Sequence, residues 1–72
     1  MSGARLSYLR RQHGLTQAQL AAKAQLTQQA ICLLERGQRR PLLVTCQRLA
    51  RALEVSLDDL LVPDPPLAPP HV

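Results

Sequence analysis

Arginine is the residue type whose chemistry stands out in this sequence of 72 amino acids. Eight of the nine cationic side chains are arginines and the ninth is Lys23. All nine lie within residues 1–53 together with a single acid, Glu35, which gives this part of the chain a net charge of +8. A guanidinium group presents paired N–H donors that fit phosphate oxygens better than an ammonium group does. The composition therefore favours a partner that bears phosphate groups, with a solvated basic face or codon bias as the alternatives.

Residue types that catalyse reactions or bind metals are few and scattered. The two cysteines, Cys32 and Cys46, form no CxxC motif, and neither His13 nor His71 stands at metal-ligand spacing from them. The sequence has no glycine-rich phosphate loop, and 72 residues hardly enclose a substrate. We therefore expect a protein that is not an enzyme and that needs no cofactor and no metal. Cys46 is expected in the core, and Cys32 either flanks the functional face inertly or senses oxidation.

The length and the proline distribution predict one small domain followed by a tail. A chain of this size has room for a single core, and with one aromatic residue, Tyr8, that core must be aliphatic. Five of the six prolines lie in the last ten residues, where they exclude regular structure. We expect a domain over residues 1–62 and an extended tail or truncated linker over 63–72. No leader segment and no apolar run long enough to span a membrane is visible, so we expect a cytoplasmic protein with no membrane contact.

Apolar residues recur at helical spacing and never alternate as in strands, which predicts an all-α protein. Thr16 with Gln19 forms a capping-box pattern, Thr27 is another N-cap candidate, and Ser56 with Asp59 repeats the first pattern. The expected helices lie near residues 4–13, 17–24, 28–36, 44–53 and 57–61. The helices 17–24 and 28–36, joined by a three-residue turn, have the layout of a helix-turn-helix.

Several separated motifs occur in a fixed order along residues 4–61. They are Gly14-Leu15-Thr16-Gln17, Leu20-Ala21, Thr27-Gln28-Gln29-Ala30-Ile31, Leu34-Glu35-Arg36-Gly37, Arg40-Pro41 and Leu49-Ala50-x-Ala52-Leu53-x-Val55-Ser56. With these motifs the chain resembles the Cro/CI-type (XRE) DNA-binding domain of lambdoid phage repressors. The resemblance implies a compact five-helix lambda-repressor-like bundle. It also implies a sequence-specific transcriptional regulator, with repression favoured, that binds a palindromic operator in double-stranded DNA as a homodimer.

The resemblance assigns roles to individual residues. The helix near 28–36 would enter the major groove, with Gln28 and Gln29 reading base edges, because a glutamine amide can both donate to and accept from adenine. Leu33 is apolar where relatives often carry a polar reader, so contact with a thymine methyl is expected there. Arg10 and Glu35 would form an interior ion pair that also holds Arg10 near a phosphate. Gln17 and Arg10 would contact phosphates. Apart from the resemblance, Arg36, Gln38, Arg39 and Arg40 directly follow this helix and are either further phosphate contacts or a flexible basic loop.

Some positions depart from the family pattern. Gln25 and Glu54 stand where glycine often follows a helix, so we expect a positive φ at each. The apolar run of Leu42, Leu43 and Val44 either packs beneath the last helix or forms a dimer surface. In the dimer reading the interface consists of Leu43, Val44 and Leu57.

Two further classes of function compete with DNA binding. A protein-interaction module of the same fold, such as an antitoxin-type partner, is the first alternative, and an enzyme is the second. An interaction module has no need to concentrate nine cations within residues 1–53, so the charge distribution favours DNA.

Overall fold

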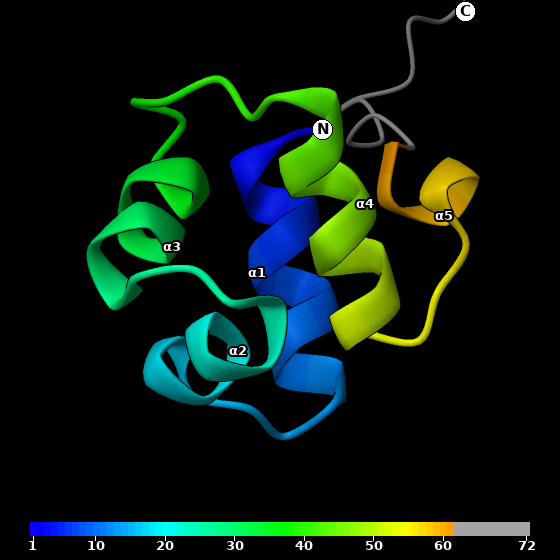
Figure 1. Cartoon of the computed structure of the whole chain (residues 1–72), viewed down its shortest axis with the longest axis horizontal. Helices are drawn as coiled ribbons and strands as arrows, with labels where there is room; N and C mark the ends of the chain where they lie inside the picture. Colours follow the sequence, from blue (N-terminus) through cyan, green and yellow to red (C-terminus); the bar gives the residue numbers. More distant parts are fainter. Residues whose placement is uncertain (62–72) are drawn as a thin grey trace, which may run out of the picture.

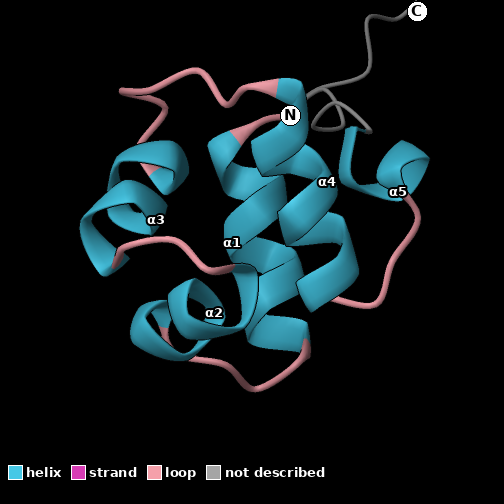
Figure 2. Cartoon of the chain, in the orientation of Figure 1, coloured by secondary structure: helices cyan, strands magenta, loops and turns pink. Residues whose placement is uncertain are grey.

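A computed structural model describes residues 1–61 of the chain (Figure 1). Within these residues it contains helices and no strand (Figure 2). The helices are α1 (Gly3–Gln12), α2 (Gln17–Ala24), α3 (Gln28–Glu35), α4 (Leu43–Ala52) and α5 (Leu57–Leu61). The all-α architecture predicted from the apolar spacing is confirmed. The predicted tail at 63–72 and the predicted domain end at residue 62 lie outside the described residues.

Side-chain caps begin every described helix except α4, and three of them follow the sequence prediction. Thr16 Oγ1 accepts from the Gln19 N–H at 3.1 Å while Gln19 Oε1 accepts from the Thr16 N–H at 2.9 Å, which completes the capping box. Thr27 Oγ1 accepts from the Ala30 N–H at 3.1 Å. Ser56 Oγ accepts from the Asp59 N–H at 3.0 Å.

Three helices differ by one residue from their predicted bounds. α1 covers Gly3–Gln12 rather than 4–13, because Ser2 Oγ accepts from the Arg5 N–H at 3.0 Å and begins the helix earlier. α3 ends at Glu35, with Arg36 as its C-cap. α4 covers Leu43–Ala52 rather than 44–53, with Leu53 as its C-cap. Helix ends fray by a residue, so these shifts leave the element order unchanged.

Gln25 and Glu54 end their helices in the left-handed conformation, as predicted. Their φ angles are 58° and 57°. In each case the next N–H returns to a carbonyl five residues back: Leu26 donates to Ala21 at 2.8 Å and Val55 to Ala50 at 3.0 Å. This pattern satisfies carbonyls that the helix end would leave free.

The core is aliphatic and joins the helices of the described part. α2 contacts α3 and α4, α1 contacts α3 and α5, and α4 contacts α5. In Figure 1, α1 runs through the centre of the view with α2 and α3 on one side and α4 and α5 on the other. The buried apolar side chains are Leu6, Leu9, Leu20, Ala21, Ala24, Ile31, Leu34, Cys46, Leu49, Ala50, Leu53 and Leu60. Cys46 is thus a core residue, as predicted.

The start of α1 lies directly against the end of α3. A Cβ atom added to Gly3 would lie 2.6 Å from the carbonyl oxygen of Leu34 and closer still to that of Glu35. No side chain fits there without displacing backbone. Gly3 therefore sets how closely the two helices approach, a role that the sequence analysis did not anticipate.

Candidate nucleic-acid interface

The N-terminus of α3 presents two exposed glutamines. Gln28 and Gln29 are the first residues of the helix, directly after the Thr27 cap, and both side chains are exposed. The turn 25–27 between α2 and α3 has the predicted length. The first turn of α3 therefore carries free amide donors and acceptors.

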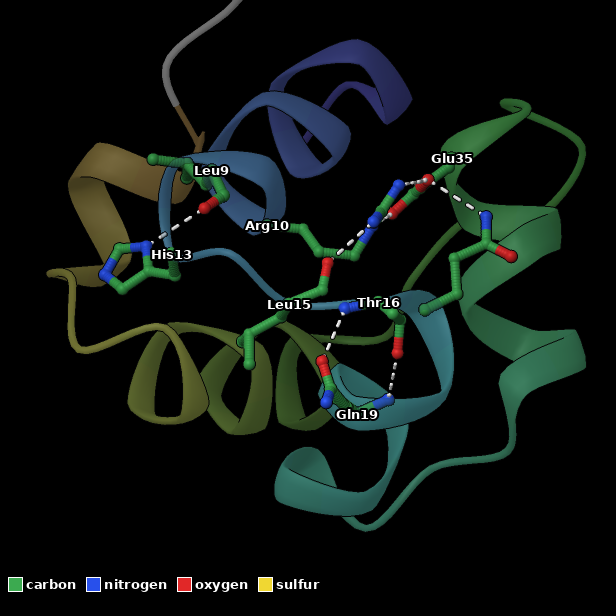
Figure 3. A network of polar contacts seen from close by, with 8 residues as sticks. Leu9, Arg10, His13, Leu15, Thr16, Gln19 and Glu35 are labelled. Carbon is green, nitrogen blue, oxygen red and sulfur yellow. Dashed lines mark hydrogen bonds and ion pairs between the residues drawn. The ribbon is translucent and has the colours of Figure 1, made fainter.

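Arg10 and Glu35 form the predicted ion pair between α1 and α3. Arg10 Nε lies 2.6 Å from Glu35 Oε2, and Arg10 Nη2 donates to Glu35 Oε1 at 3.1 Å (Figure 3). The two side chains are 11% and 8% exposed. This forked geometry gives two charge-assisted hydrogen bonds and fixes both side chains relative to each other.

Arg10 also holds the segment that leads into α2. Its Nη1 donates to the carbonyl oxygen of Leu15 at 2.8 Å. The hydrogen bond to Glu35 raises the pKa of the Arg10 guanidinium above its ordinary value; burial opposes this rise and the charge of Glu35 adds to it. Arg10 is therefore cationic at every pH at which the fold is expected to exist.

Gln17 joins the same network, which the sequence analysis did not foresee. Its Nε2 donates to Glu35 Oε1 at 3.1 Å, and its side chain is half-buried. One carboxylate thus fixes a side chain of α1 and the first residue of α2. The Gln17 amide keeps one N–H and its oxygen for a further partner. The clue in the sequence was that Glu35 is the one acid available to Arg10 and Gln17 within residues 1–53.

The loop after α3 carries the predicted basic residues on the surface. Arg36, Gln38, Arg39 and Arg40 are all exposed. Within residues 1–61 none of these arginines forms an ion pair. Gly37 has a φ of 73°, and the Gln38 N–H donates to the Leu33 carbonyl at 3.0 Å, which turns the chain out of the helix.

Two apolar side chains of α3 are only partly buried. Leu33 and Cys32 are both half-buried, whereas Ile31 and Leu34 face the core. Leu33 therefore keeps part of its surface on the side of α3 that does not face the core. Cys32 is a free thiol, as is the buried Cys46.

The apolar segment before and at the start of α4 is exposed. Leu42, Leu43 and Val44 are 71%, 64% and 50% exposed, so the expectation that they pack beneath the last helix is wrong. The buried face of α4 begins at Cys46, which leaves the preceding turn clear of the core. Leu57 is half-buried and packs against the core, so it offers less free surface than the dimer reading assumed.

Comparison with known proteins decides the family. The helix-turn-helix family model HTH_3 matches residues 6–60. The chain belongs to the helix-turn-helix family. This membership makes it a DNA-binding transcriptional regulator of the Cro/CI (XRE) type.

Relatives of this helix-turn-helix protein are similar over most of their length. An uncharacterized HTH-type transcriptional regulator, y4dJ, of Sinorhizobium fredii is 43% identical over 61 residues, which are 85% of this chain and 79% of the relative. The restriction-modification controller protein C.AhdI of Aeromonas hydrophila has a TM-score of 0.81 at 39% identity, covering 82% of this chain and 86% of that one. The DNA-binding domain of the P22 C2 repressor has a TM-score of 0.79 at 30% identity, covering 82% and 78%. No helix in the described part of the chain is long and apolar enough to cross a membrane.

Proposed function

We propose that this helix-turn-helix protein represses transcription by binding a two-fold-symmetric operator as a homodimer, with α3 in the major groove. One observation carries the proposal. The network of Arg10, Glu35 and Gln17 holds the N-terminus of α2 beside α3, whose own N-terminus carries exposed Gln28 and Gln29. This is the arrangement in which one helix reads bases and the other contacts the backbone. The proposal places the protein in the cytoplasm with its DNA.

Base reading is assigned to three side chains of α3. Gln28 and Gln29 have the amide groups that pair with N6 and N7 of adenine. Leu33 has no hydrogen-bonding group, so its exposed part would contact the methyl group of a thymine. The operator half-site should therefore be read by hydrogen bonds at one end of α3 and by apolar contact further along it.

Phosphate contacts are assigned to side chains on both sides of the reading helix. Gln17 would use its remaining amide N–H together with the free backbone N–H groups at the start of α2. All three guanidinium nitrogens of Arg10 donate a hydrogen bond within the protein. A phosphate would therefore be bound only by the second N–H of Nη1 and of Nη2. The remaining contacts would come from the exposed loop residues Arg36, Gln38, Arg39 and Arg40.

Dimerisation is assigned to the exposed apolar segment. A single module with so few base contacts does not reach specific affinity against the competing sites of a genome. Leu43 and Val44 supply apolar surface for a two-fold interface, with the exposed part of Leu57 at its side.

Selection of binding sites from random duplex DNA tests the proposal, because it reports binding, symmetry and half-site spacing together. On the selected site, Gln28→Ala should cost about 1–3 kcal/mol and relax the preference at one base position. Arg40→Ala should weaken all sequences alike and lower the salt slope by about 1.

Two outcomes contradict the assignment. If Gln28→Ala leaves the base preference intact while Arg40→Ala alters it, the two roles are reversed. If neither change affects DNA binding, a protein-interaction role takes first place.

A further inference from the structure

A hollow between the C-terminal ends of α2 and α4 is lined by three cations. Lys23 comes from the last turn of α2, and Arg48 and Arg51 come from α4. The hollow has a volume of about 350 Å³ and includes Ala24, Gln25, Ala52 and Glu54 in its wall. α2 and α4 are in contact, and residues near the C-terminal ends of both line this hollow.

Small residues create the space and charged residues surround it. Ala24 is buried and Ala52 half-buried, whereas Lys23, Arg48 and Arg51 are exposed. A volume of this size lies within the range of about 300–1,000 Å³ that is typical of small-molecule pockets. Charges of one sign that line a concave surface also strengthen the electrostatic potential within it, and this raises the local concentration of counter-ions.

The three cations have no internal counter-charge. Within residues 1–61 none of them forms an ion pair, and Glu54 in the same wall lies beyond ion-pair distance of them. Cations in a last turn complement the negative end of a helix, and that explains Lys23 and Arg51. It does not explain Arg48, which lies in the middle of α4 and adds a third positive charge to the same hollow.

We propose that the hollow of Lys23, Arg48 and Arg51 binds a small phosphate ester that also carries a hydrogen-bond donor. The guanidinium groups fit the phosphate, and the Glu54 carboxylate accepts from a hydroxyl or amino group of the same molecule. Glu54 disfavours duplex DNA at this place, because its negative charge repels a continuous row of phosphates. The hollow shares no residue with the proposed base readers or phosphate contacts, so this site is independent of the proposed function.

NMR titration of the full-length ¹⁵N-labelled protein tests the site with adenosine 5′-monophosphate and with inorganic phosphate. The nucleotide should shift the amide signals of residues 23–25 and 48–54 along a saturating curve. Arg48→Gln should weaken nucleotide binding by about tenfold, because it removes a charged hydrogen-bond donor. Arg11→Gln is the matched control, since Arg11 is an exposed cation of α1 outside the hollow, and it should leave binding unchanged.

A further variant tests the role of Glu54. Glu54→Gln removes a negative charge that repels phosphate, so it should tighten binding of inorganic phosphate. The nucleotide should gain less or lose affinity, because its donor then faces a neutral amide in place of a carboxylate. If Glu54→Gln tightens both ligands equally, the proposed ligand class is wrong.

Four other results overturn the proposal. Shifts that do not saturate, or an equal loss in Arg11→Gln, mean that phosphate is attracted to the basic surface in general. If Arg48→Gln weakens binding of a non-specific DNA duplex as much as it weakens the nucleotide, the hollow belongs to the DNA interface. If an oligoglutamate peptide shifts these signals and the nucleotide does not, the hollow is a docking site for acidic protein segments.

Discussion

At the scale of residues, Glu35 organises the site. Its carboxylate accepts from Arg10 Nε and Nη2 and from Gln17 Nε2, and thereby ties α1 and α2 to the end of α3. A buried ion pair fixes geometry more reliably than it adds stability, because desolvation offsets much of the Coulomb attraction. The value of Glu35 is therefore that it places Gln17.

Neutralising Glu35 should be strongly destabilising. Glu35→Gln leaves Arg10 as a largely buried cation without its counter-charge, so the free energy of unfolding should fall by about 3 kcal/mol. Urea denaturation followed by circular dichroism measures this loss. Glu54→Gln changes an exposed acid outside the network and should stay within about 0.5 kcal/mol of the parent.

The double variant Arg10→Met with Glu35→Leu separates charge from packing. It removes both charges together, so it should cost less than Glu35→Gln alone. A larger loss in the double variant would mean that the hydrogen bonds to Leu15 and Gln17, and not the unpaired charge, dominate the effect.

At the scale of elements, the close approach of α1 and α3 at Gly3 is the contact that should tolerate least change. Gly3→Ala places a methyl group against the carbonyls of Leu34 and Glu35, so the helices must separate. We expect a loss of about 1–3 kcal/mol in the free energy of unfolding, as for an overpacked core. Thermal and urea denaturation measure it.

Gly14 provides the contrast to Gly3. A Cβ on Gly14 meets no atom within 4 Å, but its φ of 65° strains any residue other than glycine or asparagine. Gly14→Asn should therefore be milder than Gly14→Ala, whereas Gly3→Asn should be at least as damaging as Gly3→Ala. Equal tolerance of asparagine at both positions would show that the carbonyls of Leu34 and Glu35 can move aside for a side chain at position 3.

The sequence predicts what depends on local chemistry. The Thr16 capping box and the left-handed residues Gln25 and Glu54 follow from spacing and helix ends, and the structure confirms them. The Arg10–Glu35 pair could be predicted because the family resemblance located it and no other acid lies within residues 1–53.

Other features depend on how the helices are placed in space. The packing of Gly3 against α3 and the bond from Gln17 to Glu35 join residues distant in sequence. The sequence left two alternatives for Leu43, buried beneath the last helix or exposed. Apolar spacing identifies the apolar face of a helix but does not show which of its turns are covered by another helix.

At the scale of the whole molecule, three surfaces differ in chemistry. The N-termini of α2 and α3 with the following loop are polar and basic, the hollow between α2 and α4 is cationic, and the start of α4 is apolar. A domain of this size buries only about 60% of the surface of its unfolded chain. A second copy of the chain that covers the exposed apolar segment would therefore add stability. It would also bring a second DNA-binding unit.

The dimer proposal predicts that polar substitutions on this segment produce a monomer. Both protomers contribute the same residues to a two-fold interface, so Leu43→Gln with Val44→Gln removes apolar surface from both sides of it. The dimer dissociation constant should therefore rise by roughly 100-fold or more. Sedimentation equilibrium measures the association, and a binding assay with the selected operator should show a parallel loss of affinity. Both side chains are at least half exposed, so the fold itself should be retained.

Tyr8→Gln is the matched control for the dimer variant. Tyr8 is 53% exposed, close to Val44 at 50%, but lies on α1, where Arg5 is stacked over its ring at 5.6 Å from the centroid. Tyr8→Gln should leave both the dimer dissociation constant measured by sedimentation and the affinity for the operator unchanged. If Tyr8→Gln produces the monomer and the α4 variant remains dimeric, the two-fold axis lies beside α1. The symmetric operator would then be read with a half-site spacing set by that face.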